Sequence, residues 1–576
     1  MTRRWIGALF AGAAIMVAAC GGSTPSTAPA TQAPASQGTA SEAPATEAPA
    51  SQDAGAPTPG GTLVVGLEGD INRTDAAIVD DLNSSYVLQQ AVEGLVTLAA
   101  GTGDEIVPAL ATEWSVSDDA LTYTFKIREG VKFHDGTDLN AEAVKWNFDR
   151  WLNIPQSYID LSYTYYIDSV IGRGDKSFVE SVTVVDDSTV DVKLRNPNSA
   201  FLLQLTLTPF AIQSPTAIEA GGGNDPDFAN NKYATGVAPT MVGTGPFMFK
   251  EWVNGDHVTL EKNPNYWNAS AGGPYLDAIT FRSLPETTAR LNALTAGDID
   301  LAQNIAPVDL PTVEGDPELA VIDRGSACNL GTIGMNQSFK PFDNLKIRQA
   351  VAAAIDRQGI VDAFFGPAGT VVDNWTPPGS PFEKELAFPA YDPEAAKALI
   401  AESGVAPADL AFDFWYPSDV TRAYMPDPKG EAEAILGMLE AVGFQPNPQT
   451  DPWDPTYLAK WTAGDYPMFL AGWNCDWFGI DNFLYTAFFG YQGGQPNPTY
   501  DWRNDEANQA MLDALAATDE ATQQTNWEKA QDLILADMPS VPIGSLKSPG
   551  GISTKVQGFA ASPTQTEFFT NVWLGQ

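Results

Sequence analysis

The hydrophobic pattern of this chain alternates between strand and helix periods. Alternating or short apolar runs predict strands in the first half at 62–66, 109–114, 121–127, 131–133, 181–185, 189–194, 247–252, 257–262, 279–284 and 299–301. A period near 3.6 predicts helices at 86–98 and 286–296. Another helix should begin after the capping residue Asn140, because Val144, Phe148 and Trp151 then share one face.

The pattern breaks near Arg324 and Gly325, where a second unit begins. This unit has a strand-like run up to 335–336, helices at 345–364, 393–403 and 430–442, and strands at 412–416 and 469–473. Strands that alternate with helices in this way predict an α/β fold. The remaining chain is longer than one core usually holds, so two or three lobes are expected.

The first 22 residues have the layout of an export signal. Arg3 and Arg4 precede an apolar run at 5–19, and small residues lead to Cys20. The run is shorter than the about 20 residues that span a bilayer. The cysteine after the cleavage point resembles the lipobox of bacterial lipoproteins. We therefore expect a signal peptide at 1–19 and a lipid on Cys20 that holds the protein at the outer face of the cytoplasmic membrane, in the cell envelope. A plain secretory signal is the alternative.

The segment at 20–60 has the composition of a linker. Residues 21–61 contain no Ile, Leu, Val, Met, aromatic residue, Lys or Arg. Nothing in such a stretch compensates the entropy of ordering it, so we expect a disordered tether that reaches on the order of 35 Å.

The charge excludes one class of partner. The chain has 72 acidic and 31 basic residues, a net charge of −41, and no basic run. Such a surface repels phosphate backbones, so we expect no nucleic-acid binding. The acids are expected to form a solvated shell.

Two cysteines, Cys328 and Cys475, follow the export signal and linker. Their pairing does not follow from the sequence alone. We expect two buried free thiols, with a disulfide as the alternative.

Several motifs occur in a fixed order along the chain. They lie at 121–136, 140–148, 243–247, 262–267, 341–351, 354–357 and 391–397. Each is weak alone. Together, from about residue 60 to the C-terminus, they resemble the family 5 extracellular solute-binding proteins, which are the peptide- and nickel-binding components of ABC importers.

The resemblance implies an α/β, two-lobe fold of the periplasmic-binding-protein type (type II). Lobe I would comprise 61–325, with an extra subdomain at about 106–235, and lobe II would comprise 326–540. Residues 541–576 would return to lobe I. Crossing strands would join the lobes as a hinge.

The strongest candidate site is the run at 472–483, where an apolar strand is followed by aromatic residues and two carboxylates. In peptide-binding family members, a similar Gly-Trp-x-x-Asp-aromatic run supplies the aspartate that pairs with the substrate's α-amino group. That role falls here on Asp476. A fixed carboxylate would replace the water that a closing cleft strips from an ammonium. The chain departs from the family at 478–480, where Phe-Gly-Ile stands in place of Pro-Asp-Pro, so the substrate's identity stays open.

Flat rings suit peptide side chains and sugar rings alike. The remaining ligand-binding candidates are Trp375, Trp415, Tyr416, Trp473, Trp477 and Asn336. Packing in a core is the alternative for each aromatic residue.

Metal and cofactor chemistry has little support. His134 and His257 are the only histidines, and no cysteine cluster accompanies them. We predict no cofactor and no preformed metal site, although nickel bound as a chelate stays open from the resemblance. The motifs of common hydrolases and nucleotide-binding enzymes are absent. We therefore predict a binding protein and not an enzyme, with a lipid-anchored hydrolase as the rival.

The predicted mechanism is a hinged clamp. A monomeric protein captures a short peptide between its lobes and presents it to a membrane permease. A β-glucoside or oligosaccharide is the second choice, prompted by the 15 tryptophans. Fluorescence titration with peptides and sugars distinguishes these ligands.

Overall fold

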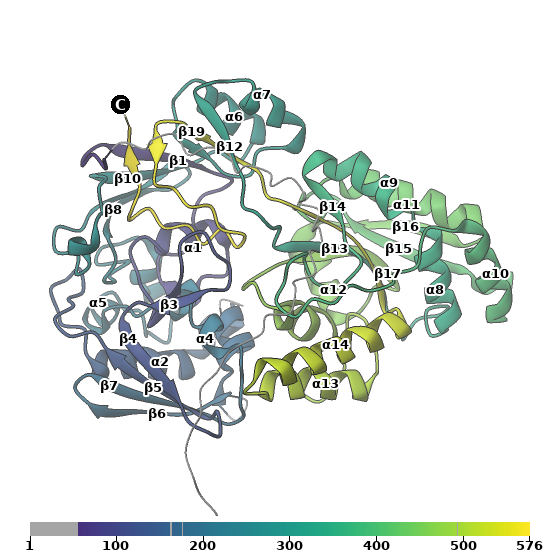
Figure 1. Cartoon of the computed structure of the whole chain (residues 1–576), viewed down its shortest axis with the longest axis horizontal. Helices are drawn as coiled ribbons and strands as arrows, with labels where there is room; N and C mark the ends of the chain where they lie inside the picture. The colour runs from purple at the N-terminus through teal and green to yellow at the C-terminus, as the bar shows by residue number, and fades with distance from the viewer. Residues whose placement is uncertain (1–55, 162–163, 175–176, 492, 576) are drawn as a thin grey trace, which may run out of the picture. The chain divides into compact units, whose positions relative to one another are not determined.

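The computed structural model describes residues 56–161, 164–174, 177–491 and 493–575 (Figure 1). The expected signal peptide, Cys20 and nearly all of the linker lie outside the described residues. Among the residues described, we find no helix with the length and hydrophobicity of a membrane span.

The first lobe is built on a seven-stranded sheet of order β12-β19-β11-β1-β10-β9-β8. Its strands are β1 (Thr62–Leu67), β8 (Phe247–Val253), β9 (His257–Lys262), β10 (Ala278–Ser283), β11 (Leu301–Ala302), β12 (Leu319–Ile322) and β19 (Gly550–Ser553). The central strand β1 pairs in parallel with β10 and β11, and its Leu63 and Val65 are fully buried, as an inner strand requires. The same lobe contains the helices α1 (Leu82–Leu88), α6 (Thr287–Thr295) and α7 (Leu310–Glu314).

A separate antiparallel sheet of order β4-β5-β7-β6 belongs to the same part of the chain. Its strands are β4 (Ala111–Val116), β5 (Thr122–Ile127), β6 (Val179–Asp186) and β7 (Thr189–Leu194). Helix α2 (Ala141–Leu152) packs on β6 and β7, and the Asn140 side chain accepts a hydrogen bond from the Ala143 N–H. Val144, Phe148 and Trp151 are fully buried, which confirms the predicted helix and its buried face. Short elements surround it: α3 (Gln156–Asp160), α4 (Phe201–Gln204) and α5 (Pro215–Ala220).

The predicted helix at 86–98 is wrong beyond its first turn. Helix α1 ends at Leu88, and residues 96–98 form β2 (Val96–Leu98), which pairs with β3 (Ile106–Pro108). Between them, the carbonyl of Glu93 accepts a hydrogen bond from the Ile212 N–H at 2.9 Å. A partner distant in sequence therefore replaces the helical hydrogen bonds that the local pattern favours.

The second lobe is built on a six-stranded sheet of order β14-β18-β13-β17-β15-β16. Its strands are β13 (Asn329–Met335), β14 (Gly369–Val371), β15 (Ala411–Pro417), β16 (Gln445–Asp451), β17 (Met468–Asn474) and β18 (Ser540–Leu546). Its helices are α8 (Leu345–Ala354), α9 (Arg357–Ile360), α10 (Pro393–Ser403), α11 (Pro428–Val442), α12 (Leu458–Ala463), α13 (Asp505–Ala516) and α14 (Glu520–Asp537). The helix predicted at 345–364 is interrupted, because Ile355 is extended and Asp356 caps a new helix, α9.

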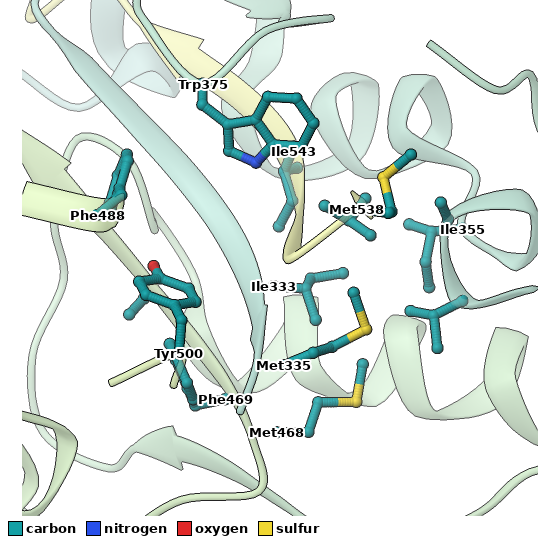
Figure 2. Packing of buried hydrophobic residues seen from close by; sticks show 14 of the residues in the cluster. Ile333, Met335, Ile355, Trp375, Met468, Phe469, Phe488, Tyr500, Met538 and Ile543 are labelled. Carbon is teal, nitrogen blue, oxygen red and sulfur yellow. The ribbon is translucent and has the colours of Figure 1, made fainter. Parts of the chain in front are cut away.

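The core of the second lobe lies against this sheet. Ile333 and Met335 of β13, Met468 of β17 and Ile543 of β18 are fully buried and belong to one hydrophobic cluster (Figure 2). Trp375 belongs to the same cluster and donates its indole N–H to Ser540 Oγ at 2.7 Å. The neighbouring strands β13, β17 and β18 thus share one apolar core.

The chain passes between the two large sheets twice, from β12 to β13 through 323–328 and from β18 to β19 through 547–549. Arg324 on the first crossing donates to the carbonyl of Ser548 on the second at 2.6 Å, and from Nε to Glu567 Oε1 at 2.8 Å. The expected return to the first lobe at 541 falls inside β18, which still belongs to the second sheet. The other lobe limits stay predictions.

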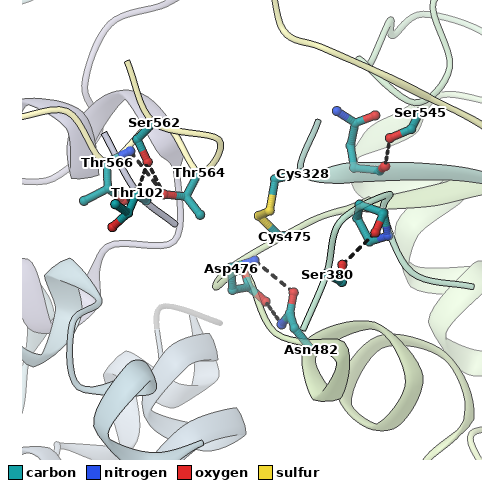
Figure 3. The surroundings of a disulfide bond; sticks show 12 residues. Thr102, Cys328, Ser380, Cys475, Asp476, Asn482, Ser545, Ser562, Thr564 and Thr566 are labelled. Atoms are coloured by element: carbon teal, nitrogen blue, oxygen red, sulfur yellow. Dashed lines mark hydrogen bonds between the residues drawn. A yellow bond between two sulfur atoms is a disulfide. The ribbon is translucent and has the colours of Figure 1, made fainter. Parts of the chain in front are cut away.

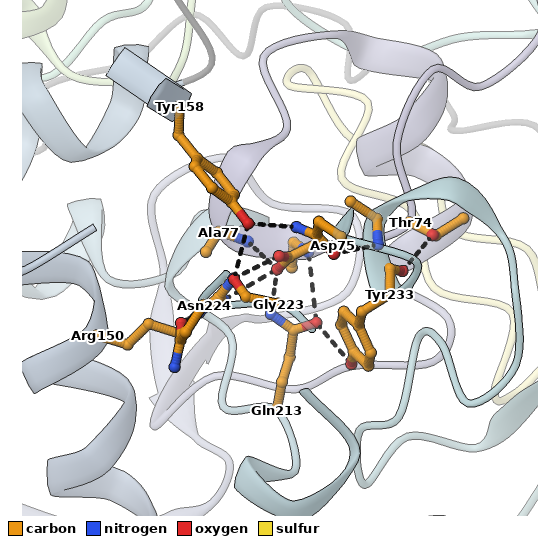
Figure 4. A network of polar contacts seen from close by, with 12 residues as sticks. Thr74, Asp75, Ala77, Arg150, Tyr158, Gln213, Gly223, Asn224 and Tyr233 are labelled. Carbon is orange, nitrogen blue, oxygen red and sulfur yellow. Dashed lines mark hydrogen bonds and ion pairs between the residues drawn. The ribbon is translucent and has the colours of Figure 1, made fainter. Parts of the chain in front are cut away.

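A buried ion pair ties α2 to the start of the first lobe (Figure 4). The Arg150 and Asp75 side chains are 1% and 0% exposed, and Arg150 Nη1 donates to Asp75 Oδ1 at 3.0 Å. Gln213 donates to the same oxygen at 3.3 Å, and Tyr233 donates to Gln213 at 3.0 Å. Arg150 also donates to Asn224 Oδ1 at 2.8 Å and to the Gly223 carbonyl at 3.0 Å. The buried charges are therefore hydrogen-bonded, as burial requires.

Candidate ligand-binding site

A cavity of about 1240 Å³ is lined by residues of both lobes. The first lobe contributes α1, the β2–β3 hairpin and a pair of tyrosines, Tyr165 and Tyr166. The second lobe contributes the end of β17, the loop after it and part of α12. This volume exceeds the about 300–1,000 Å³ of a typical small-ligand pocket, so the cavity has room for a ligand larger than a single amino acid.

Asp476 lies in this cavity, in the loop that follows β17 (Figure 3). Its backbone N–H donates to Asn482 Oδ1 at 3.0 Å, and Asn482 Nδ2 donates to Asp476 Oδ2 at 3.0 Å. Burial raises the pKa of Asp476, while hydrogen bonds from Asn482, Tyr166, Tyr165 and Trp473 act to lower the pKa. The carboxylate is thus fixed by its own loop and partly removed from water.

Cys328 and Cys475 form a disulfide, so the expectation of two free thiols is wrong (Figure 3). Strands β13 and β17 pair Asn329 with Asn474, and this register sets the two cysteines side by side with their Cα atoms 5.3 Å apart. The Cys475 N–H also donates to the Cys328 carbonyl at 2.8 Å. Strand register is a tertiary property, which explains why the pairing did not follow from the sequence.

The first lobe supplies a contact to Asp476 that sequence reasoning missed. Tyr165 donates from its hydroxyl to Asp476 Oδ2 at 3.2 Å. The ring of Tyr165 lies 4.9 Å from that of Tyr166 and 6.3 Å from that of Trp473, between centroids. Only the aromatic composition of this segment could have drawn attention to it.

Arg422 is a second residue that sequence reasoning missed. It is half-buried and is the one basic residue among the described residues that line the cavity. Its guanidinium lies over the ring of Trp453, 5.1 Å from the centroid. The acidic residues in the lining are Glu68, Asp80, Asp81, Glu93, Asp454 and Asp476. No local motif marks Arg422 in the sequence.

Two of the predicted aromatic residues line the cavity with Asp476. Trp473 is half-buried, and Trp477 is 2% exposed and donates its indole N–H to Asp481 at 3.0 Å. Burial raises the pKa of Asp481 to about 6.

Four of the predicted ligand-binding residues lie outside the cavity lining: Trp375, Trp415, Tyr416 and Asn336. Trp375 is in the core of the second lobe, and Trp415 stacks on Tyr466 with ring centroids 4.6 Å apart. Tyr416 packs partly buried against that core. Asn336 donates to the carbonyls of Gly464 and Pro498 at 3.0 and 2.9 Å, which fixes a turn.

Among the residues that the structure describes, no group of three or more His, Cys, Asp or Glu side chains is arranged to hold a metal ion. His134 is half-buried beside the carbonyl of Gly245, and the loss of water around the ring lowers its pKa. His257 lies on β9 next to Asp256. Neither histidine lines the cavity.

Known proteins identify the fold and family. The family described as bacterial extracellular solute-binding proteins, family 5 Middle, matches residues 105–495. Heme-binding protein A of Haemophilus influenzae is 30% identical over 511 residues, which cover 86% of this chain and 89% of that protein. The dipeptide-binding protein of Escherichia coli is 27% identical over 492 residues, which cover 83% and 88%.

Among solved structures, the ABC transporter-associated periplasmic binding protein DppA of Helicobacter pylori, in complex with the peptide STSA, matches with a TM-score of 0.73 and 26% identity. The match covers 90% of this chain and 99% of that one. It confirms the expected α/β fold of two-lobe periplasmic binding proteins. The chain therefore belongs to family 5 of the bacterial extracellular solute-binding proteins.

Proposed function

We propose that this protein is the extracytoplasmic substrate-binding component of an ABC importer and captures short peptides by closing its two lobes. The observation that carries the proposal is a cavity with a buried carboxylate, Asp476, and a single basic side chain, Arg422, among the described residues of its lining. A peptide has an ammonium at one end and a carboxylate at the other, so the two side chains complement its termini. The names of the dipeptide-binding relative and the peptide-bound neighbour support the same ligand class.

Asp476 is the partner for the amino terminus. Its loop is fixed by Asn482 before any ligand arrives, so little ordering is required on binding. Burial raises its pKa because the ionised carboxylate loses water, and an ammonium restores a favourable partner for that charge.

Arg422 is the partner for the carboxy terminus. Its guanidinium forms no ion pair within the described part of the chain and interacts with the Tyr424 side chain, so its charge is available to an anion. The Trp453 ring on one face restricts the guanidinium plane, which suits two parallel hydrogen bonds to a carboxylate.

Closure follows from contacts with both lobes. A ligand that bonds to the second lobe through Asp476 also packs against α1 and the β2–β3 hairpin of the first lobe. It favours the closed form to the extent that it binds the closed form more tightly than the open form. The closed form would then be the one that a permease accepts.

Titration with peptides that lack one charge tests the two assignments. We expect N-acetylation of a peptide, or Asp476→Asn in the protein, to raise the Kd at least about tenfold, the usual effect of losing a charged hydrogen bond. Asp413→Asn is the matched control, because Asp413 lies on β15 outside the cavity lining and bonds to Asn447. Equal affinity of parent and Asp476→Asn for a free peptide would refute the amine site.

The other terminus is tested in the same way. C-terminal amidation and Arg422→Gln should weaken binding by similar factors and should not add, because both remove the same contact. Arg503→Gln is the control, since Arg503 is exposed and pairs with Asp501 outside the lining.

A panel of β-glucosides, oligosaccharides and nickel chelates in the same assay tests the other ligand classes. The tryptophans Trp453, Trp461, Trp473 and Trp477 in the lining favour sugars as the second candidate. Product analysis after long incubation with each ligand tests the lipid-anchored hydrolase, which would convert its substrate.

The proposal includes attachment by a lipid on Cys20, in the cell envelope, and a monomeric state. Cys20 follows the export signal and precedes the linker. Incorporation of labelled fatty acid into the parent but not into Cys20→Ser tests the anchor, and sedimentation tests the monomer.

A further inference from the structure

The carboxylate proposed to bind the ligand's amine is held by both lobes. Asn482, from the same loop as Asp476, donates to Asp476 Oδ2 at 3.0 Å. Tyr165, from the first lobe, donates to the same oxygen at 3.2 Å. Tyr165 belongs to the first lobe and Asp476 to the second, so this bond forms only when the lobes are together.

The tyrosine is itself held in place. Its ring meets the Tyr166 ring at 74° with centroids 4.9 Å apart, and lies 6.3 Å from the Trp473 ring. Its backbone carbonyl accepts a hydrogen bond from Ser169 Oγ at 2.8 Å. Tyr165, Tyr166, Trp473 and Asp476 all line the cavity. A hydroxyl held this way orients the carboxylate, because Tyr165 and Asn482 both donate to Oδ2.

We propose that Tyr165 is a positioning residue that reaches across the cavity from the first lobe and orients Asp476 for the cationic group of the ligand. This inference rests on the proposed function of Asp476. It implies that the amine site is complete only in the closed form, so that recognition of the amine and closure of the lobes are coupled.

The charged and titratable groups around Asp476 determine how its pKa should change when the Tyr165 hydroxyl is removed. Tyr165 and Tyr166 face Asp476 from the first lobe, where Asp80 and Asp81 act on Tyr166. Asp481 belongs to the same loop as Asp476, and Arg422 lines the same cavity. The hydroxyl of Tyr165 lowers the pKa of Asp476 against the opposing effect of burial. Its removal must therefore raise that pKa further.

The experiment follows the carboxyl carbon of Asp476 by NMR through a pH titration of the intact protein labelled at aspartate. The signal is assigned by its loss in Asp476→Asn. In Tyr165→Phe we expect the midpoint to move to higher pH. In Tyr123→Phe, the matched control, it should stay in place, because that hydroxyl bonds to the Asn198 carbonyl and lies outside the cavity lining.

A second arm measures Kd for a free-amine peptide against pH. We expect Tyr165→Phe to raise the Kd about tenfold near neutral pH. The acid limb of the Kd–pH profile should move to higher pH by the same amount as the NMR midpoint. If Tyr165→Phe loses affinity but the acid limb of its Kd–pH profile stays where it is in the parent, the loss comes from structural damage. That result would overturn the inference. An unmoved NMR midpoint would also overturn it.

The two proposals fail separately. If the NMR midpoint moves but no peptide binds to the parent, the positioning role stands and the peptide assignment falls. If peptide binds to the parent and Tyr165→Phe changes neither the midpoint nor the Kd, the positioning role falls and the peptide assignment stands.

Discussion

The disulfide next to Asp476 gives the largest stability effect that we expect from a two-residue change. Cys328 and Cys475 close a loop with a sequence separation of 147. In the chain-entropy model, a crosslink of this span stabilises the folded state by about 5 kcal/mol, and removal of native disulfides costs about 2–5 kcal/mol. We therefore expect Cys328→Ala combined with Cys475→Ala to lower the free energy of unfolding by about 3–5 kcal/mol. Alanine is chosen because Cys328 is 7% exposed, and a serine hydroxyl there would need a new partner.

Urea unfolding followed by tryptophan fluorescence measures this effect. The midpoint of the double variant should fall, and its m-value should rise, because the unfolded chain expands once the crosslink is gone. The parent under reducing conditions should behave like the double variant, and added reductant should not change the variant. Coincident midpoints for the oxidised parent and the double variant would refute the reasoning.

Three further predictions concern the folded state. Burial raises the pKa of Glu431, which is 0% exposed, from 4.5 to about 8. The free energy of unfolding should therefore fall as pH rises from 4.5 through 8. Glu431→Gln should abolish this fall and raise the free energy of unfolding by on the order of 3 kcal/mol at pH 7. Urea midpoints measured over a pH series test this, and the same pH dependence in parent and variant would contradict it. Arg150→Met leaves Asp75 buried without its charge partner and should cost about 3–5 kcal/mol, whereas adding Asp75→Asn should recover part of the loss in a double-mutant cycle. Trp375→Phe leaves Ser540 Oγ without its donor and should cost about 1–3 kcal/mol of stability, while peptide affinity stays within twofold because Trp375 is outside the cavity lining.

Local pattern predicted most strands and helices of the fold, because their hydrophobic faces are also their buried faces. Helix α2 and the hairpin of β6 and β7 are examples in which capping and alternation agree with tertiary packing. The pattern failed where a distant partner decides the conformation. At Glu93, the bridge to Ile212 ends a predicted helix, and the disulfide depends on the register of β13 and β17.

The candidate site was predictable only in its second-lobe loop. The resemblance placed Asp476 in that loop, and Trp473 and Trp477 flank it. Tyr165 and Arg422 were missed because each lies in a different segment, and only the fold brings them to one cavity. Trp375 shows the opposite error, since a tryptophan looks the same in sequence whether it fills a core or lines a cleft.

The crossing at 323–328 connects the first lobe to the candidate ligand-binding site. Arg324 at one end is anchored in the first lobe by Glu567, with both side chains almost fully buried. Cys328 at the other end is anchored by the disulfide to the residue before Asp476. Only residues 325–327 lie between these anchors, and Gly325 has φ of +72°, a conformation that favours glycine. Because the anchors resist displacement, a rotation of one lobe against the other must be absorbed by the backbone torsions of 325–327 and of the second crossing at 547–549. The short path also means that such a rotation reorients the Asp476 loop together with the second-lobe sheet, while Tyr165 stays with the first lobe. Separation of the lobes therefore breaks the Tyr165–Asp476 bond directly, without any rearrangement inside either lobe.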